Sequence, residues 1–133
     1  MARHIKDSER DPMNWSRQWK KSSNQTKQRN YVRKAPAHVR TTLVAGHLSK
    51  DLREKHKRRG MRIRQGDTVK IMRGQFKGKT GKVDRIDTKK ARIHISGIGK
   101  TKKDGGKVLY PIRASNIMIT DLNLNDKKRI KTK

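Results

Sequence analysis

The chain has 133 residues and a formal net charge of +27, from 38 Lys and Arg against 11 Asp and Glu. This excess of positive charge predicts a polyanionic partner, and nucleic acid fits it better than a small acidic ligand does. With 29% hydrophobic and 4% aromatic residues, the chain can hold one small domain, and part of it is expected to become ordered only on its partner.

Composition and pattern exclude several classes of protein. The sequence has no cysteine, which removes disulfides, thiol nucleophiles and thiolate metal sites. No apolar run approaches the roughly 20 residues of a membrane span, and no stretch has the broad apolar face of a membrane-surface helix. The five histidines have no set of carboxylates close to them. We therefore expect no metal site, no cofactor and no catalytic residues, and the chain is predicted not to be an enzyme.

The positive charge is spread over the whole chain. Residues 1–60 carry a net +12, residues 61–122 a net +11 and residues 123–133 a net +4. These segments are the three expected parts: a basic extension, a folded domain, and a basic C-terminal tail that is expected to fray.

The first part of the extension is expected to have little independent order. Residues 1–34 are polar and basic, and their only aromatic groups are Trp15, Trp19 and Tyr31. Residues 22–26 are predicted to be coil.

Two short helices are expected in the rest of the extension. The first follows Pro36 and ends near Gly46. The second is capped by Ser49, has Asp51 in its first turn and ends in basic residues before Gly60. A helix this short is marginal in water, so the second helix is expected to lie on nucleic acid.

The pattern after Gly60 changes to short runs of alternating apolar residues, separated by turn-forming residues such as Gly66-Asp67 and Gly105-Gly106. The strands are expected at residues 68–73, 82–86, 91–95, 108–110 and 117–119. Five short strands connected as a meander predict a small closed or nearly closed β-barrel.

A glycine-rich segment lies between the first two expected strands. It ends in Gly-Lys-Thr, as a phosphate-binding P-loop does, but three residues rather than four separate Gly74 and Gly78. A strand rather than a helix is predicted after Thr80, so nucleotide hydrolysis is not expected.

The same segment fits a hairpin loop. Glycines there permit positive φ and close backbone approach, and Arg73, Lys77, Lys79 and Lys82 surround them with cations. Such a loop can present N–H groups and charges to a sugar-phosphate backbone, but the spacing fits an ordinary hairpin equally well. Phe76, at the loop tip, packs on the barrel mouth in the favoured interpretation and stacks on an exposed base in the other.

Residues 66–83 resemble the KOW motif, which in its families forms the first strands and loop of an SH3-like barrel on RNA. The matching pattern is Gly66-Asp67-x-Val69-x-Ile71-x-Arg73-Gly74-x-x-Lys77-Gly78-x-x-Gly81-Lys82-Val83. The flanking residues 33–40, 48–55, 110–112 and 115–124 resemble large-subunit ribosomal protein twenty-four in its archaeal and eukaryotic form. This resemblance covers roughly residues 27–129.

The resemblance implies a mainly β fold: a small SH3-like barrel, the KOW domain, at residues 61–122, a basic rRNA-binding extension with two short helices at residues 1–60, and a tail at residues 123–133. It implies a structural constituent of the large ribosomal subunit that binds rRNA near its 5′ end and assists early subunit assembly. Its expected place is near the polypeptide exit, in the cytoplasm. The expected partners are large-subunit rRNA and neighbouring ribosomal proteins, with no small-molecule substrate.

The residues expected to contact rRNA come from the motif, from its flanks and from the basic end of the second helix. They are Arg33, Lys34, His38, Arg40, Lys50, Arg53, Arg58, Arg59, Arg73, Gly74, Lys77, Gly78, Lys79, Gly81 and Lys82.

Two other nucleic-acid functions remain as alternatives. A KOW-containing transcription elongation factor or RNA chaperone would share the motif, although elongation factors usually carry a further domain before it. A DNA-compacting protein would share the charge, although nothing in the sequence resembles a helix-turn-helix.

Overall fold

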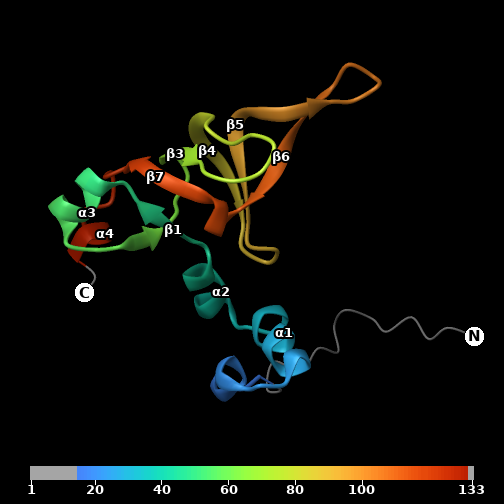
Figure 1. The fold of residues 1–133 in the computed structure, drawn as a ribbon, viewed down its shortest axis with the longest axis vertical. Helices are drawn as coiled ribbons and strands as arrows, with labels where there is room; N and C mark the ends of the chain where they lie inside the picture. The colour runs from blue at the N-terminus through green and yellow to red at the C-terminus, as the bar shows by residue number, and fades with distance from the viewer. Residues whose placement is uncertain (1–14, 132–133) are drawn as a thin grey trace, which may run out of the picture. The chain divides into compact units, whose positions relative to one another are not determined.

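The structure, a computed structural model, describes residues 15–131 of the chain (Figure 1). The chain divides into two compact units, residues 1–40 and residues 41–133. The first unit is helical where the structure describes it, and the second is built on a seven-stranded sheet.

Two helical segments begin the described part of the first unit. A 3-10 helix, η2, spans Arg17–Lys21, and the helix α1 spans Gln25–Arg33. Each begins at a polar residue whose side-chain oxygen accepts a hydrogen bond from a backbone N–H two residues on, Ser16 for η2 and Asn24 for α1. This is the usual way in which the first free N–H groups of a helix are satisfied.

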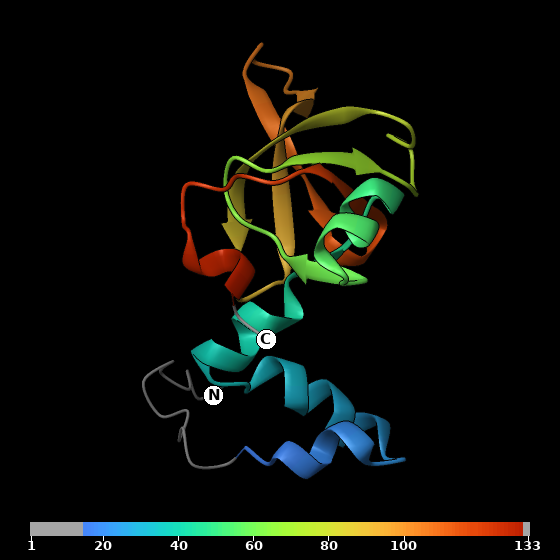
Figure 2. The ribbon, with the colours of Figure 1, turned by 90° about the vertical axis from the view of Figure 1, so that its left-hand side faces the viewer.

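An aromatic contact ties these two segments together. The indole N–H of Trp15 donates to the carbonyl oxygen of Tyr31 at 2.9 Å, and the two ring centroids lie 5.2 Å apart. Figure 2 shows η2 and α1 side by side in blue. The expectation of little order is therefore wrong for residues 15–34, because two caps and one aromatic pair fix this segment locally. Residues 1–14 lie outside the described part of the chain.

The two expected helices are confirmed with shorter bounds. The helix α2 spans Ala37–Leu43 and α3 spans Lys50–His56. Ser49 occupies the N-cap position of α3 without a side-chain hydrogen bond, and Lys57 ends the helix in the left-handed conformation with φ 54°. Among residues 15–60, the structure adds the helical segments η2 and α1 to the two expected helices.

Seven strands form the sheet of the second unit, in the order β2-β1-β7-β3-β4-β5-β6. Their bounds are Ala45–Leu48 for β1, Gly60–Arg62 for β2, Thr68–Ile71 for β3, Thr80–Asp87 for β4, Arg92–Thr101 for β5, Lys107–Arg113 for β6 and Ile117–Asp121 for β7. The 3-10 helix η3, Ala114–Asn116, joins the last two. All five expected strands are present.

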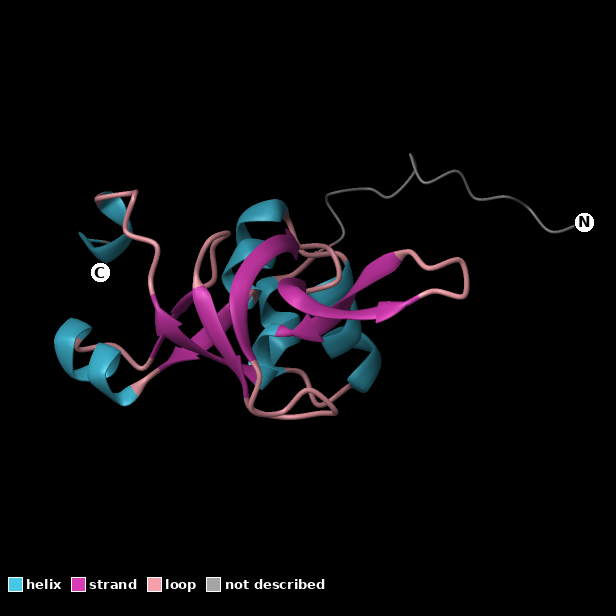
Figure 3. Cartoon of the chain, turned by 90° about the horizontal axis from the view of Figure 1, so that it is seen from above, coloured by secondary structure: helices cyan, strands magenta, loops and turns pink. Residues whose placement is uncertain are grey.

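The sheet curls around one core instead of lying flat (Figure 3). Strands β3 to β6 form an antiparallel meander, and β7 returns to pair with β3 on the other side. Register shifts interrupt the pairs β3–β7, β4–β5 and β5–β6, and such bulges bend and twist strands. The mainly β fold with a small barrel and helices before it is confirmed.

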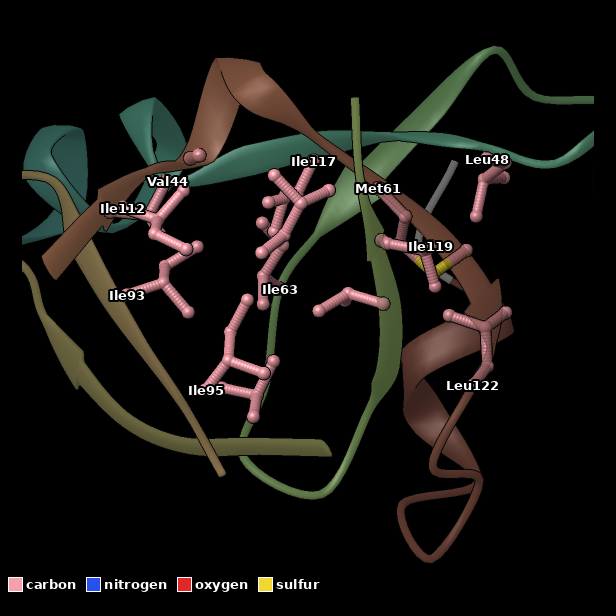
Figure 4. Packing of buried hydrophobic residues seen from close by; sticks show 14 of the residues in the cluster. Val44, Leu48, Met61, Ile63, Ile93, Ile95, Ile112, Ile117, Ile119 and Leu122 are labelled. Carbon is pink, nitrogen blue, oxygen red and sulfur yellow. The ribbon is translucent and has the colours of Figure 1, made fainter. Parts of the chain in front are cut away.

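Buried aliphatic side chains from nearly every strand meet inside this curl. Leu48, Val69, Ile93, Ile95 and Ile119 are each 0% exposed. Figure 4 shows the labelled side chains gathered between the strands. Most of the apolar residues that predicted the strands fill this core. Strand β6 differs, because Val108 is exposed and Ile112, outside the predicted range, supplies its buried side chain.

The sheet begins before the predicted start of the barrel at Met61. Strand β1 pairs in parallel with β7 and antiparallel with β2. Gly46 and Gly60, expected to end helices, lie in these two strands. A Cβ at Gly60 would lie 2.9 Å from the carbonyl oxygen of Gly46. The glycines therefore allow close approach of β1 and β2, a function that the local sequence does not reveal.

The C-terminal tail is held by a buried ion pair. The short helix α4, Lys128–Lys131, places Arg129 at 5% exposure beside Asp67 at 0%. The two nearest atoms, Nη2 and Oδ2, lie 2.6 Å apart. The expectation of a frayed tail is thus wrong for the described residues up to 131, because a buried carboxylate binds this segment.

Candidate nucleic-acid interface

The loop between β3 and β4, residues 72–79, has a fixed and compact backbone. The N–H of Gly78 donates to the carbonyl oxygen of Ile71 at 2.8 Å, and that of Lys77 to Gly74 at 3.1 Å. Gly74 and Gly78 have φ values of 94° and 86°, which L side chains rarely adopt. The loop is therefore a preorganised turn.

The last glycine of the motif lies in a strand and not in the loop, where it was expected. Gly81 lies in β4 outside the left-handed region, and a Cβ there would approach Ile95 Cγ2 to 2.6 Å and the carbonyl oxygen of Ser96 to 2.8 Å. Its role in the structure is the close packing of β4 on β5.

The cations predicted for this loop are all exposed. Arg73, Lys77 and Lys79 lie in the loop, and Lys82 lies in β4 opposite Thr68 at the start of β3. None of these four residues has an acidic partner among residues 15–131. Four uncompensated positive charges on one hairpin create a local positive potential, which suits phosphate groups.

Phe76 packs on the barrel, as the favoured interpretation of the sequence predicts. Its ring is half-buried against the core, and its centroid lies 5.2 Å from that of Tyr110. The ammonium group of Lys79 lies 5.4 Å from the Phe76 centroid. The ring therefore supports the loop and also places one of its cations.

The predicted contacts on α3 form a separate patch. Lys50 is exposed on the helix, and Arg59 is exposed just after it. Arg53 Nε donates to the carbonyl oxygen of Leu48 at 2.8 Å, so this arginine also fastens α3 to the end of β1. Arg58 is half-buried and lines a cleft of about 270 Å³.

Strand register places this patch and the glycine loop at opposite ends of the sheet. Leu48, just before α3, pairs with Ile119 near the end of β7, whereas Ile71, just before the loop, pairs with Ile117 at its start. The structure does not bring the two predicted sets together. Arg33, Lys34, His38 and Arg40 belong to the first unit, in α1, its cap and α2.

Sequence reasoning missed arginines that line two clefts. Arg92 and Arg113 border a cleft of about 290 Å³ beside the glycine loop, and Arg62 and Arg64 border the cleft at Arg58. These residues flank buried positions in alternating strands. The alternation of buried and exposed residues could have indicated that these arginines face outward. It could not show which strands pair, and this pairing brings the arginines together.

Other kinds of site find no support in residues 15–131. No group of three or more His, Cys, Asp or Glu side chains is placed to hold a metal ion. No helix there is long and apolar enough to cross a membrane.

Comparisons with known proteins identify the family of the chain. Residues 22–132 match the model of the family that comprises the eukaryotic ribosomal proteins L26 and their archaeal equivalents. The chain is also 48% identical over 108 residues to the "Large ribosomal subunit protein uL24" of Methanospirillum hungatei, across 81% of this chain and 90% of that protein. The chain therefore belongs to this archaeal and eukaryotic family of ribosomal proteins and is a structural constituent of the large ribosomal subunit.

Proposed function

We propose that the chain binds large-subunit rRNA near its 5′ end, assists early assembly of the subunit, and lies near the polypeptide exit of cytoplasmic ribosomes beside other large-subunit proteins. The observation that carries the RNA-binding proposal is the fixed β3–β4 loop, whose three exposed cations lack acidic partners among the described residues, as does Lys82 on β4. The proposed role needs no cofactor and no small-molecule substrate.

The proposed contacts follow the predicted set. Arg73, Lys77 and Lys79 in the loop and Lys82 in β4 bind phosphates. Gly74 and Gly78 fix the loop backbone, and Gly81 supports it through the packing of β4 on β5. On α3 and after it, Lys50, Arg53, Arg58 and Arg59 form the second contact. Arg33, Lys34, His38 and Arg40 extend the contact from the first unit.

Binding by this arrangement favours one folded form of the RNA. Phosphates brought together by RNA folding repel each other, and cations at fixed positions reduce that repulsion. Because two basic patches lie at opposite ends of one rigid sheet, the barrel can hold two RNA segments at a set separation. This is a physical basis for a role in assembly.

The experiment measures affinity of the full chain for a 5′-terminal rRNA fragment as a function of salt. The triple variant Arg73→Ala, Lys77→Ala, Lys82→Ala is expected to bind at least tenfold more weakly, with a salt slope smaller by about 2 to 3. The matched control is Arg85→Ala, Lys89→Ala, Lys90→Ala, which removes equal charge from exposed positions outside the proposed site.

Circular dichroism should be the same for both triple variants, which separates binding from folding. Equal losses of affinity in the two variants would show that the loop is no more than part of a diffuse positive surface. An affinity that hardly changes with salt would contradict phosphate binding as the main interaction. Preference for the 5′ fragment over an equally long fragment from elsewhere tests the proposed location on the rRNA.

A further inference from the structure

The cleft beside the glycine loop combines aromatic rings with arginines. It has a volume of about 290 Å³ and is lined by residues of the loop, β5, β6 and η3. Phe76 and Tyr110 supply the rings, and Arg73, Arg92 and Arg113 supply the cations. No carboxylate side chain lines the cleft.

The strand register places two of these cations directly opposite each other. Arg92 in β5 is the partner of Arg113 in β6, and like charges at opposed positions destabilise a sheet. Neither guanidinium group has a hydrogen-bond or ion-pair partner in the described part of the chain. Asp87 is the register partner of Arg92 on β4, but no ion pair joins the two side chains in the described part of the chain, and Asp87 Oδ1 accepts from the N–H groups of Lys89 and Lys90. An anion in the cleft would relieve this repulsion.

The sides of the Phe76 and Tyr110 rings that line the cleft are not covered by lysine side chains, so a planar ligand can lie against them. Lys79 lies over Phe76 and Lys100 lies over Tyr110, at 5.4 and 5.6 Å from the ring centroids, and neither lysine lines the cleft. The rings are tilted by 59° to each other. Asn116 also lines the cleft and offers a donor and an acceptor, which can pair with the edge of a base.

We propose that this cleft binds one unpaired nucleotide of the RNA, with its base against Tyr110 and Phe76 and its phosphate held by Arg73, Arg92 and Arg113. This inference rests on the proposed RNA-binding function and adds a base-binding site to the phosphate contacts. An acidic peptide would satisfy the arginines but would leave the aromatic wall and Asn116 without a matching group, so RNA is the favoured ligand.

The test compares two RNA hairpins that differ at a single position. One has an unpaired 2-aminopurine bulge in its stem, and the other has an abasic residue at the same place. The full chain is expected to bind the bulged RNA about tenfold more tightly, in keeping with the contribution of one stacked base. Fluorescence of the 2-aminopurine should fall on binding, because stacking quenches it.

Two variants assign this preference to the cleft. Tyr110→Leu keeps an apolar side chain against the core and removes the ring, and Arg92→Gln removes one half-buried cation. Each should reduce the preference for the bulged RNA over the abasic RNA at least threefold. Arg85→Gln, the matched control outside the cleft, should lower affinity for both RNAs by the same factor and leave the preference unchanged.

The outcomes separate this inference from the proposed function. Equal affinity for the two RNAs, or a preference that Tyr110→Leu and Arg92→Gln leave intact, would overturn the nucleotide site while RNA binding stands. Failure of the chain to bind either hairpin or the 5′ rRNA fragment at low salt would overturn the RNA-binding function itself. Displacement of the bulged RNA by an acidic peptide at equal concentration would assign the cleft to protein.

Discussion

Asp67 connects three segments that are distant in the sequence. Its carboxylate accepts from the N–H of Arg64, from the N–H of Asn123 and, through both oxygens, from the guanidinium of Arg129. Arg129 also donates to the carbonyl oxygens of Arg62 and Asn123. A buried carboxylate with this many donors holds together the segments that supply them. The turn pattern of the sequence had marked Asp67 only as a turn residue.

Removing the arginine should destabilise the barrel strongly. In Arg129→Ala, Asp67 keeps two backbone donors but loses its counter-charge in a site with 0% exposure. Breaking a buried pair in this way costs about 3 kcal/mol. Urea unfolding followed by far-UV circular dichroism measures the loss. The control Lys127→Ala removes the same charge from an exposed neighbour, and an equal midpoint for the two variants would contradict a structural role for the pair.

The ion pair between Arg64 and Asp126 lies near this buried pair but is exposed. The side-chain hydrogen bond from Arg64 and the backbone N–H of Lys128 lower the pKa of Asp126 below its usual value. A lowered pKa means that the pair stabilises the fold at neutral pH, and this contribution disappears as the pH falls through that pKa. Both side chains are about half exposed, so solvent screens the pair and its contribution is small.

At the scale of elements, the close contact of β4 and β5 depends on the absence of a side chain at Gly81. In Gly81→Ala, the new methyl group would meet Ile95 Cγ2 and the backbone oxygen of Ser96, both closer than 3.0 Å. Overpacking of this kind costs about 1 to 3 kcal/mol. Gly106→Ala is the control, because nothing lies within 4 Å of its added methyl group.

Thermal unfolding distinguishes these two glycine variants. A melting temperature lowered in Gly81→Ala and unchanged in Gly106→Ala is the expected result. Equal melting temperatures would mean that β4 and β5 can separate without loss. Because Gly81 belongs to the motif, a lowered melting temperature in Gly81→Ala would assign the last glycine of the motif to strand packing instead of loop conformation.

These elements also show what the sequence could predict. Strands whose apolar residues alternate, such as Ile93 and Ile95 in β5, were predicted because alternation is a local property. Strand β1 was missed because Gly46 and His47 interrupt the apolar pattern and resemble a helix end. The second half of β5, after the bulge that begins at His94, was missed because glycines replace the alternating residues.

The candidate site also has parts that the local sequence predicts and parts that it does not. The glycine loop was predicted because its cations and glycines lie within one continuous motif. The pairing of Arg92 with Arg113 was not, since it depends on the register of two strands. The binding of Arg129 to Asp67 likewise depends on a contact across the barrel, so neighbouring residues alone could not show that the tail is ordered.

At the scale of the whole molecule, the position of the barrel boundary decides which fragment is stable. The sequence predicts a boundary at Met61, whereas the compact second unit begins at Thr41 and includes β1. Val44 and Leu48, at 2% and 0% exposure, belong to the barrel core. Without β1, the paired edge of β7 would also be open.

A fragment of residues 41–133 is therefore expected to fold, and a fragment of residues 61–133 to be far less stable. Burial of Val44 and Leu48 together contributes about 3 to 6 kcal/mol, which is a large part of the roughly 5 to 15 kcal/mol that stabilises a typical domain. Amide NMR spectra and urea midpoints of both fragments measure the difference. Leu48→Ala in the longer fragment is the control and should give an intermediate midpoint. If the shorter fragment were as stable as the longer one, β1 would be an accessory strand and the boundary at Met61 would be the correct one.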